Sequence, residues 1–339
     1  MNTREAIDLI VSHGRDLSED EAADVMRDIM SGEATPAQIG AFLVALRLKG
    51  ETVDEITGMA RIMREHSLRV EPSEAVVDTC GTGGDASGTF NVSTAAAFVA
   101  AAAGARVAKH GNRAMTSACG SADVLEALGA KIDLSPEQVA RCIDEAGIGF
   151  MFAQAFHPAM KHVAGPRREI GVRTVFNILG PLTNPAGARH QLLGVAREEL
   201  AGPMAEVLGR LGSRHALVVH GHGGLDELSL SGPSTVHELR DGEVREYALS
   251  PEELGLTAAP NEAVRGGSPD ENAAALRAIF DGKRGPLRDI TLLNAAAALV
   301  AADVAADLGD AVRLAAEALD SGAARDKLDA FVKLTGSFA

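Results

Sequence analysis

The sequence predicts an α/β protein with two parts: a small all-helical N-terminal domain, and a larger α/β domain with a mainly parallel central sheet and helices on both faces. Residues 1–68 place apolar side chains such as Ala22, Val25 and Ile29 at helical spacing. From Val76 onward, short apolar segments alternate with helical patterns, which is typical of a mainly parallel sheet. A chain of 339 residues, of which 46% are hydrophobic, is long enough to form both units.

Three capping boxes mark the starts of helices in the N-terminal part. In each, Ser or Thr precedes the helix and Glu or Gln follows three residues later, so that free N–H groups of the first turn are satisfied. The pairs are Ser18 with Glu21, Thr35 with Gln38, and Thr52 with Glu55. We assign residues 1–68 to the helical domain and expect residues 155–180 to return to it. Residues 74–154 and 185–339 are assigned to the catalytic α/β domain, with the active site in the cleft between the domains.

The α/β domain is organised around two loops that flank one helix of small residues. The first loop is GTGGD at residues 81–85, between a predicted strand at residues 75–77 and an alanine-rich helix at residues 95–103. A strand, a glycine turn and a helix start present backbone N–H groups to an anion. Glycine is needed there because a Cβ would block both the positive-φ turn and the close approach of a phosphate.

The second loop is KHGNR at residues 109–113, which follows a strand expected to end at residues 107–108. Lys109 then lies at the carboxyl end of a strand, where open parallel sheets bind their ligands. Lys109, His110 and Arg113 are three potential cations, and we expect them to form a strong anion site. Either loop alone also fits an ordinary surface turn, but both loops joined by one helix are far more specific.

Later elements follow the same alternation of strands and helices. The predicted helices comprise residues 121–128, one that begins at Pro136, one after His157 that carries Arg167 and Arg168, and closing helices at 294–308 and 311–319. The predicted strands comprise residues 150–152, 216–219, and a hairpin formed by 235–239 and 243–248.

Histidines and acids follow the strand at residues 216–219. His220 and His222 lie on a glycine loop and, without a third ligand, are more often structural than metal-binding. Asp226 and Glu227 are better candidates, because adjacent carboxylates suit the hard cation magnesium. From the residues alone, a surface acid pair explains Asp226 and Glu227 equally well.

The amino-acid composition limits which partners and which cellular compartment we expect for this protein. The net charge of −15 argues against binding to nucleic acid or to an anionic membrane. The longest strictly apolar run, at residues 95–103, is too short to span a bilayer, and the N-terminus lacks the apolar core of a signal peptide. Cys80, Cys119 and Cys142 are odd in number and lack CxxC spacing, so we expect a reduced, cytoplasmic protein.

The motifs GTGGD, NVST, KHGNR and GSADVLEALG, in this order and spacing, closely resemble the anthranilate phosphoribosyltransferase family, which shares its fold with nucleoside phosphorylases. The segments FNILGPLTNP and LDE fit as well, so the resemblance covers nearly the whole chain. It implies transfer of phosphoribose from phosphoribosyl pyrophosphate to the amino group of anthranilate, in tryptophan biosynthesis. It further implies magnesium, with two ions per subunit, and a homodimer formed through the helical region.

The resemblance also implies which residues hold each ligand. Phosphoribosyl pyrophosphate is expected at the two loops and the polar residues after them: Gly81, Gly84, Asp85, Thr89, Asn91, Ser93, Thr94, Lys109, His110, Gly111, Asn112, Arg113, Ala114, Met115, Thr116, Ser117 and Ser121. Anthranilate is expected at Gly81, Asn112, Arg167, His110 and Pro181, where Arg167 would hold its carboxylate. Magnesium is expected at Ser93, Asp226 and Glu227.

No residue is assigned as an obligatory acid or base, because an aromatic amine is already neutral at pH 7. The family often has Lys and Ser where this chain has Ala118 and Cys119, which leaves fine phosphate contacts of the second loop open. Two alternatives share the fold: a pyrimidine nucleoside phosphorylase and a non-catalytic relative that binds nucleic acid. The KHGNR loop, Arg167 and GPLTNP argue against the first alternative, and the acidic balance with Asp226 and Glu227 argues against the second.

Overall fold

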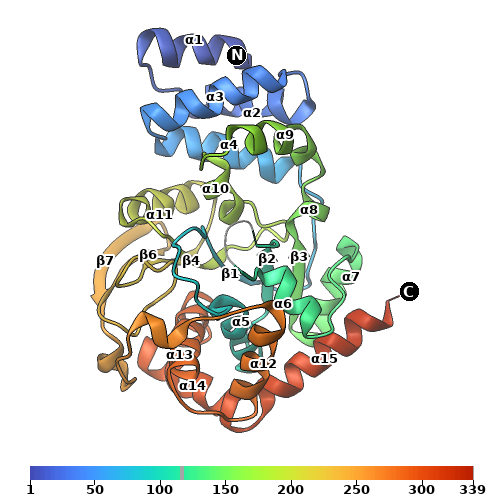
Figure 1. The fold of residues 1–339 in the computed structure, drawn as a ribbon, viewed down its shortest axis with the longest axis vertical. Helices are drawn as coiled ribbons and strands as arrows, with labels where there is room; N and C mark the ends of the chain where they lie inside the picture. The colour runs from blue at the N-terminus through green and yellow to red at the C-terminus, as the bar shows by residue number, and fades with distance from the viewer. Residues whose placement is uncertain (115–117, 339) are drawn as a thin grey trace.

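The structure is a computed structural model that describes residues 1–114 and 118–338. Figure 1 shows two lobes: helices α1 to α4 with α9 at the top of the view, and the sheet with the remaining helices below. No helix within the described residues is both long enough and apolar enough to cross a membrane.

Four N-terminal helices form the upper lobe, and the predicted capping boxes start three of them. The side chains of Ser18, Thr35 and Thr52 each accept a hydrogen bond from the backbone N–H three residues later, and the Glu or Gln there bonds back. These three predictions are confirmed. The helices are α1 (Thr3–His13), α2 (Glu19–Ser31), α3 (Pro36–Lys49) and α4 (Val53–Glu65).

A later part of the chain packs against this bundle. Helix α9 (Lys161–Ile170) contacts α2 and α3, and Val163 on α9 is fully buried in the same hydrophobic cluster as the bundle. The shorter helices α8 (Ala153–Phe156) and α10 (Phe176–Leu179) lie on either side of α9 in the chain, and Leu179 belongs to the same cluster.

Seven strands form a single sheet in the order β3-β2-β1-β4-β5-β6-β7, and the first five are parallel. The mainly parallel sheet predicted from the sequence is therefore confirmed. The predicted hairpin is also present, because β6 and β7 are antiparallel and Asp241 and Gly242 between them both have positive φ. The strands are β1 (Val77–Gly81), β2 (Val107–Gly111), β3 (Ile148–Phe152), β4 (His190–Gly194), β5 (His215–His220), β6 (Ser234–Arg240) and β7 (Glu243–Leu249).

Neighbouring residues of the buried strands point to opposite faces of the sheet, as the two-residue period of a strand requires. Leu192 and Leu217 belong to the hydrophobic cluster that contains α5 (Val92–Ala102) and α13 (Pro286–Ala301). The adjacent Leu193 and Val218 belong to the cluster of the helical bundle and α11 (Ala201–Arg210). Helices therefore cover both faces, as predicted.

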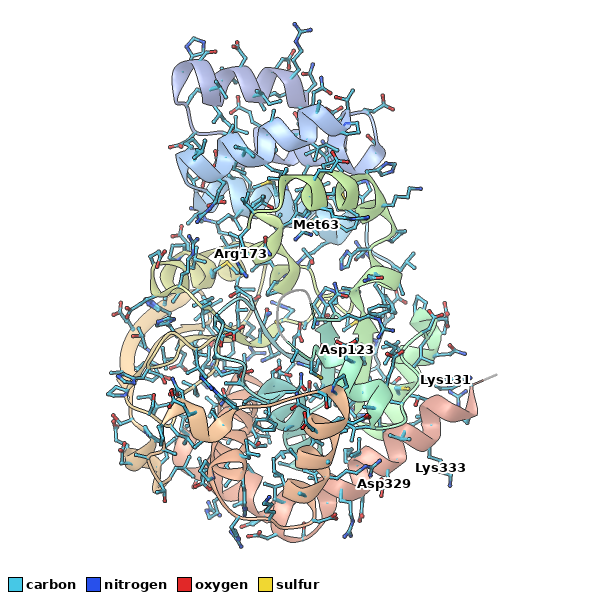
Figure 2. All side chains as sticks on the ribbon, in the orientation of Figure 1. Met63, Asp123, Lys131, Arg173, Asp329 and Lys333 are labelled. Carbon is cyan, nitrogen blue, oxygen red and sulfur yellow. The ribbon has the colours of Figure 1, made fainter. Side chains whose placement is uncertain are left out.

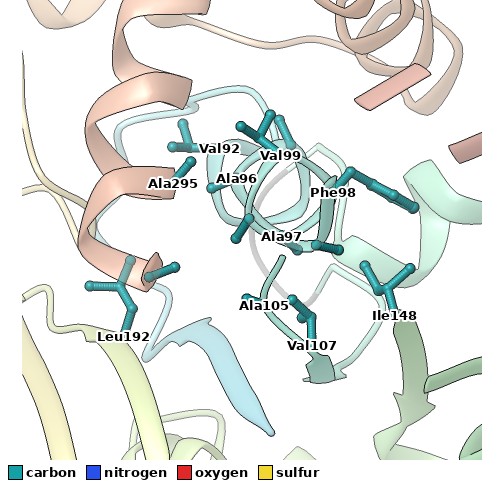
Figure 3. Packing of buried hydrophobic residues seen from close by; sticks show 14 of the residues in the cluster. Val92, Ala96, Ala97, Phe98, Val99, Ala105, Val107, Ile148, Leu192 and Ala295 are labelled. Atoms are coloured by element: carbon teal, nitrogen blue, oxygen red, sulfur yellow. The ribbon is translucent and has the colours of Figure 1, made fainter. Parts of the chain in front are cut away.

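Helix α5 lies at the centre of the lower core. Its alanines let α13 approach closely, and Figure 3 shows Ala96 and Ala97 of α5 near Ala295 of α13 and Val107 of β2. A larger side chain at these fully buried positions would have to push two elements apart. This packing fixes the start of α5, and hence the polar residues that precede it.

Several predicted boundaries were wrong. Strand β1 begins at Val77 and includes Gly81, and β2 includes Lys109, His110 and Gly111, so three of the five residues of the predicted KHGNR loop are strand. The predicted helix at 294–308 is instead α13, which begins at Pro286 because proline suits the first helical position and ends at Ala301.

Several whole elements in the second half of the chain were not predicted. They include α10, β4, α11, α12 (Pro269–Phe280) and α15 (Ala323–Ser337). The other predicted helices are present as α6 (Ser121–Ala127), α7 (Pro136–Arg141), which continues into a π-helical turn (Cys142–Ala146), and α14 (Leu308–Asp320).

Candidate active site

The site lies where the strand order reverses, between β1 and β4, which is where open α/β sheets bind ligands. The GTGGD loop leaves β1 there, and the N–H of Thr82 donates to the carbonyl of Gly194 at the end of β4, at 2.9 Å. The loop after β5 reaches the same point. The N–H of Gly83 donates to Asp226 Oδ2 at 2.7 Å, and the N–H of Ser93 donates to Glu227 Oε1 at 3.1 Å.

The glycines of the GTGGD loop are required for two separate reasons. Gly83 and Gly84 have φ values of 63° and 79°, a region that other residues rarely adopt. A Cβ at Gly81 would collide with the carboxylate of Asp226, and one at Gly84 would collide with the guanidinium of Arg173. The loop is therefore held between Asp226 and Arg173.

Lys109 is buried beneath this loop. Its ammonium group donates to the carbonyl of Thr79 and, at 3.1 Å, to the hydroxyl of Ser93. Burial lowers the pKa of Lys109, while the nearby carboxyl groups of Asp78, Glu227 and Asp226 oppose that shift. The ammonium group of Lys109 therefore lies close to the carboxyl groups of the site.

Asp226 and Glu227 are crowded. Burial and the neighbouring Asp85 raise the pKa of Asp226 to about 7, and burial together with Asp226 raises the pKa of Glu227 well above its usual range. A divalent cation would relieve this repulsion, and the Ser93 hydroxyl completes a set of oxygen donors that suits magnesium.

Within the described ranges no group of three or more His, Cys, Asp and Glu side chains is arranged to hold a metal. A magnesium ion here would take its remaining ligands from water and substrate phosphates, as it usually does. The two neighbouring histidines bond elsewhere, His220 to the carbonyl of Val195 and His222 to the hydroxyl of Ser231, consistent with the structural role expected for them.

The three potential cations of KHGNR do not form the anion site that we expected. His110 lies 3.2 Å from His157, Nε2 to Nε2, and burial with the proximity of His157 lowers the pKa of His110 to about 3. His110 is therefore neutral at pH 7. Arg113 is paired with Asp123 at 3.1 Å and with Glu126 on α6, so its charge is already matched. Lys109 remains the cation closest to the acid pair.

The second loop is tied to the start of α6. The carbonyl of Asn112 accepts hydrogen bonds from the Ser121 hydroxyl at 3.3 Å and from the Ala122 N–H at 3.2 Å. The carboxylate of Asp123 accepts from the N–H groups of Ala114 and Gly120. Three residues assigned to the substrate site, Met115, Thr116 and Ser117, lie outside the described residues.

Arg167 on α9 is half-buried and has no carboxylate partner among the described residues. Its guanidinium lies 5.3 Å from the centre of the Phe176 ring, and burial with the nearby Arg173 lowers the pKa of Arg167. Pro181 is buried, and its carbonyl accepts from Gln191 at 2.7 Å. An unpaired guanidinium of this kind is suited to a carboxylate ligand.

The other assigned residues belong to the GTGGD loop and the start of α5. Asp85 accepts from the N–H of Ser87, Thr89 forms a β-bridge with Arg265, and Thr94 is fully buried. Asn91 donates to the carbonyl of Cys119 at 3.2 Å and so joins the two loops.

Four residues that support the site were missed in the sequence. The carboxylate of Asp78 accepts from the His110 N–H at 3.1 Å and from Asn184 at 2.7 Å, and Asn272 donates to Asn91 at 2.9 Å. Arg173 donates to the carbonyl of Gly83 at 2.9 Å. Asp78 could have been found, since it is an acid directly after a predicted buried strand, whereas Arg173 and Asn272 carry no local signal.

Comparisons with known proteins agree with this geometry. Residues 73–325 match the model of the glycosyl transferase family a/b domain, and residues 4–67 match the helical bundle domain of the same family. The chain is 60% identical to an anthranilate phosphoribosyltransferase of Roseiflexus castenholzii and 59% identical to one of Chloroflexus aggregans, covering 99% of each chain.

Solved structures of anthranilate phosphoribosyltransferases are also similar to this chain over nearly its whole length. The anthranilate phosphoribosyltransferase of Thermus thermophilus matches with a TM-score of 0.93 at 50% identity, over 98% of this chain and 99% of that one. The Saccharomyces cerevisiae enzyme, solved in complex with PRPP and Mg, matches with a TM-score of 0.90 at 29% identity, over 99% and 98% of the two chains. The chain therefore belongs to the anthranilate phosphoribosyltransferase family.

Proposed function

We propose that this protein transfers the phosphoribosyl group of phosphoribosyl pyrophosphate to the amino group of anthranilate, releasing pyrophosphate, as a step of tryptophan biosynthesis. The observation that carries the proposal is the meeting of the GTGGD loop, Lys109 and the acid pair Asp226 and Glu227 at the carboxyl edge of the parallel sheet. This combination suits a sugar pyrophosphate, since it offers N–H groups, a cation and a place for metal ions. The relatives named above support the identity of both substrates.

Phosphoribosyl pyrophosphate would bind across the two loops. The glycine loop would supply backbone N–H groups, while Asn91, Ser93 and Lys109 would supply side-chain donors. The N–H groups of Gly83 and Ser93 now donate to Asp226 and Glu227, so a phosphate that takes these donors would free both carboxylates for metal.

We infer that magnesium, as two ions per subunit, is held by Ser93, Asp226 and Glu227. The raised pKa values of the two carboxylates support this, because a bound cation would offset their mutual repulsion. When bound, magnesium would neutralise the pyrophosphate and orient its leaving oxygen.

Anthranilate would bind next to phosphoribosyl pyrophosphate, between Arg167 and the KHGNR loop. Arg167 would hold the carboxylate, and His110, Asn112 and Pro181 would border the ring. The nucleophilic amine needs no strong base, and a histidine with a pKa of about 3 is a poor one at pH 7. Catalysis would therefore depend on positioning and on charge stabilisation of the reacting groups.

One assay tests the proposal. Purified protein with magnesium and both substrates should consume anthranilate, followed by the loss of its fluorescence. Asp226→Asn with Glu227→Gln should weaken activity and magnesium dependence together, whereas Glu252→Gln with Glu253→Gln, a solvent-exposed acid pair of the α/β lobe, should not. Cleavage of a pyrimidine nucleoside by inorganic phosphate, without any loss of anthranilate, would replace the proposal by the phosphorylase alternative.

We further infer a homodimer formed through the helical lobe and a cytoplasmic location. Exposed apolar side chains on adjacent elements of that lobe, among them Val11 and Leu48, support the dimer. The three cysteines are free thiols, which suits a reducing compartment.

A further inference from the structure

Three arginines from separate parts of the chain converge on one hollow between the lobes. Arg47 comes from the end of α3, Arg173 from the segment between α9 and α10, and Arg197 from the segment after β4. The hollow has a volume of about 130 Å³ and is open to solvent. Figure 2 labels Arg173 at the junction of the two lobes, on the sheet side of Met63. Arginine is concentrated here although the chain as a whole is strongly acidic.

The positive charge in this hollow is not balanced by its walls. Glu51 is the one acid among the described residues that line it, and its carboxylate is 4.0 Å from Arg47. Arg197 pairs loosely at 3.6 Å with Glu199, which is exposed. Burial lowers the pKa of Arg173, and so does repulsion from Arg197 and Arg47, while the carboxylates of Asp226 and Asp85 oppose that shift. An anion in the hollow would remove that repulsion.

The wall also contains a buried hydroxyl that has no partner. Thr174 lines the hollow, is 4% exposed, and its Oγ1 makes no hydrogen bond to any described residue. Its N–H donates to Asn177 Oδ1 at 2.9 Å, which holds the backbone in place. A buried hydroxyl without a partner costs stability, so its position favours a ligand that can accept a hydrogen bond from it.

We propose that this hollow binds an oxyanion of the phosphate class through Arg47, Arg173 and Arg197, with the Thr174 hydroxyl as a further donor. Guanidinium groups match phosphate oxygens in pairs, and a tetrahedral anion can meet three of them from different directions. A planar carboxylate offers only two oxygens in one plane, so it fits this arrangement less well.

The hollow lies next to the proposed substrate site and shares Gly84 of the GTGGD loop with it. Lys109, Ser93, Asp226 and Glu227 do not line the hollow. At Gly83 the N–H points to Asp226 on one side, and the carbonyl accepts from Arg173 on the other. The Arg173 Nη2 atom makes these loop contacts, which leaves Nε and Nη1 without a hydrogen-bond partner in the part of the chain that the structure describes.

Binding here would connect three parts of the molecule. Arg47 belongs to the helical lobe, Arg197 to the sheet, and Arg173 holds the carbonyls of Thr82 and Gly83. An anion shared by all three would hold the lobes together and keep Arg173 on the GTGGD loop. The bound protein should therefore unfold at a higher temperature.

Calorimetric titration in magnesium-free buffer at constant ionic strength tests the proposal, with inorganic phosphate, pyrophosphate and ribose phosphate as separate probes. Wild-type protein should bind one anion at this hollow, and Arg47→Gln with Arg197→Gln should weaken that binding by about tenfold or more, as expected for lost charged hydrogen bonds. Thr174→Val should weaken it less. The three probes distinguish a free ion from a phosphorylated metabolite as the preferred ligand.

A matched control separates a specific site from a general loss of charge. Arg141→Gln with Arg313→Gln removes the same charge from exposed arginines of α7 and α14, and should leave the affinity unchanged. Equal binding by wild type and the Arg47, Arg197 variant would overturn the proposal. So would loss of all binding in Lys109→Gln, because the anion would then occupy the substrate site.

The outcome is independent of the proposed transferase function. The Arg47, Arg197 variant should still consume anthranilate when phosphoribosyl pyrophosphate and magnesium are present, because neither residue belongs to the proposed substrate site. A wild-type protein without transferase activity that still binds phosphate through Arg47 would refute the proposed function and leave the anion site intact.

Discussion

The exposure, charge and position of Arg167 all suit one role, which is binding the carboxylate of anthranilate. It is half-buried, lies over the Phe176 ring and has no acid partner within the described ranges. We predict that Arg167→Ala raises the KM for anthranilate roughly 10- to 100-fold, the effect of losing a charged hydrogen-bonded contact, with a smaller change in kcat. The adjacent exposed Arg168→Ala is the matched control. Steady-state kinetics with an unchanged KM would remove Arg167 from the acceptor site.

His110 and His157 form a second residue-scale feature, a buried pair that is neutral at pH 7. Burial lowers the pKa of His157 to about 4, below the ordinary value of about 6.5 for an unfolded chain. Between these values the unfolded state binds the extra proton, so this histidine's contribution to stability is present above about pH 6.5 and is lost as the pH falls. At pH 5 the loss is about 2 kcal/mol.

We therefore predict that His157→Asn loses less stability than wild type when the pH is lowered from 7 to 5. The comparison between variants matters, because Asp226 and Glu227 have raised pKa values and act in the opposite direction over the same range. Urea unfolding at each pH measures the difference, with the exposed His13→Asn as the control. Equal losses in wild type and His157→Asn would show that His157 is not held neutral.

At the scale of elements, α12 positions the two loops through one chain of amides. The N–H of Gly267 donates to Asn272 Oδ1 at 2.8 Å, Asn272 Nδ2 donates to Asn91 Oδ1 at 2.9 Å, and Asn91 Nδ2 donates to the carbonyl of Cys119. Because the Gly267 N–H can only donate, it requires the Asn272 amide to present its oxygen there, and this in turn fixes which way the Asn91 amide is turned. Asn272 therefore determines which group Asn91 turns toward the second loop.

We predict that Asn272→Asp raises the KM for phosphoribosyl pyrophosphate by roughly fivefold to tenfold, as a lost hydrogen bond would, with less effect on kcat. The new carboxylate can still accept from Gly267, but it cannot donate to Asn91, whose amide would have to turn. Asn2→Asp makes the same chemical change at the cap of α1 and serves as the control. A variant with unchanged KM would mean that the orientation of Asn91 is set elsewhere.

The elements also show why only part of the structure was predictable. A capping box such as Thr35 with Gln38 lies within four residues, so the sequence contains the whole interaction. The GTGGD loop was predictable for the same reason. Arg173 and Asn272 act on residues 90 and 181 positions away, and no local pattern records such contacts. The charge state of His110 likewise depends on His157, which the fold alone brings near.

For the molecule as a whole, the exposed apolar residues are unevenly distributed. Val11 on α1 is 67% exposed and Leu48 on α3 is 82% exposed. Val44, also on α3, and Val172, just after α9, are exposed as well. Since α3 contacts both α1 and α9, these side chains belong to one packed unit. We place the dimer contact inferred above at this surface, because it is the part of the helical lobe where exposed apolar side chains gather.

We predict that the protein is a dimer of twice 35.1 kDa, and that Val11→Glu with Leu48→Glu converts it to a monomer. Two like charges would have to be buried against each other in the dimer, whereas in the monomer they would face water at little cost. Light scattering after size-exclusion chromatography measures the mass. Val244→Glu with Val304→Glu adds the same charges to exposed valines outside the helical lobe and should leave the dimer intact. A monomeric wild type, or equal dissociation by both variants, would place the contact elsewhere or exclude it.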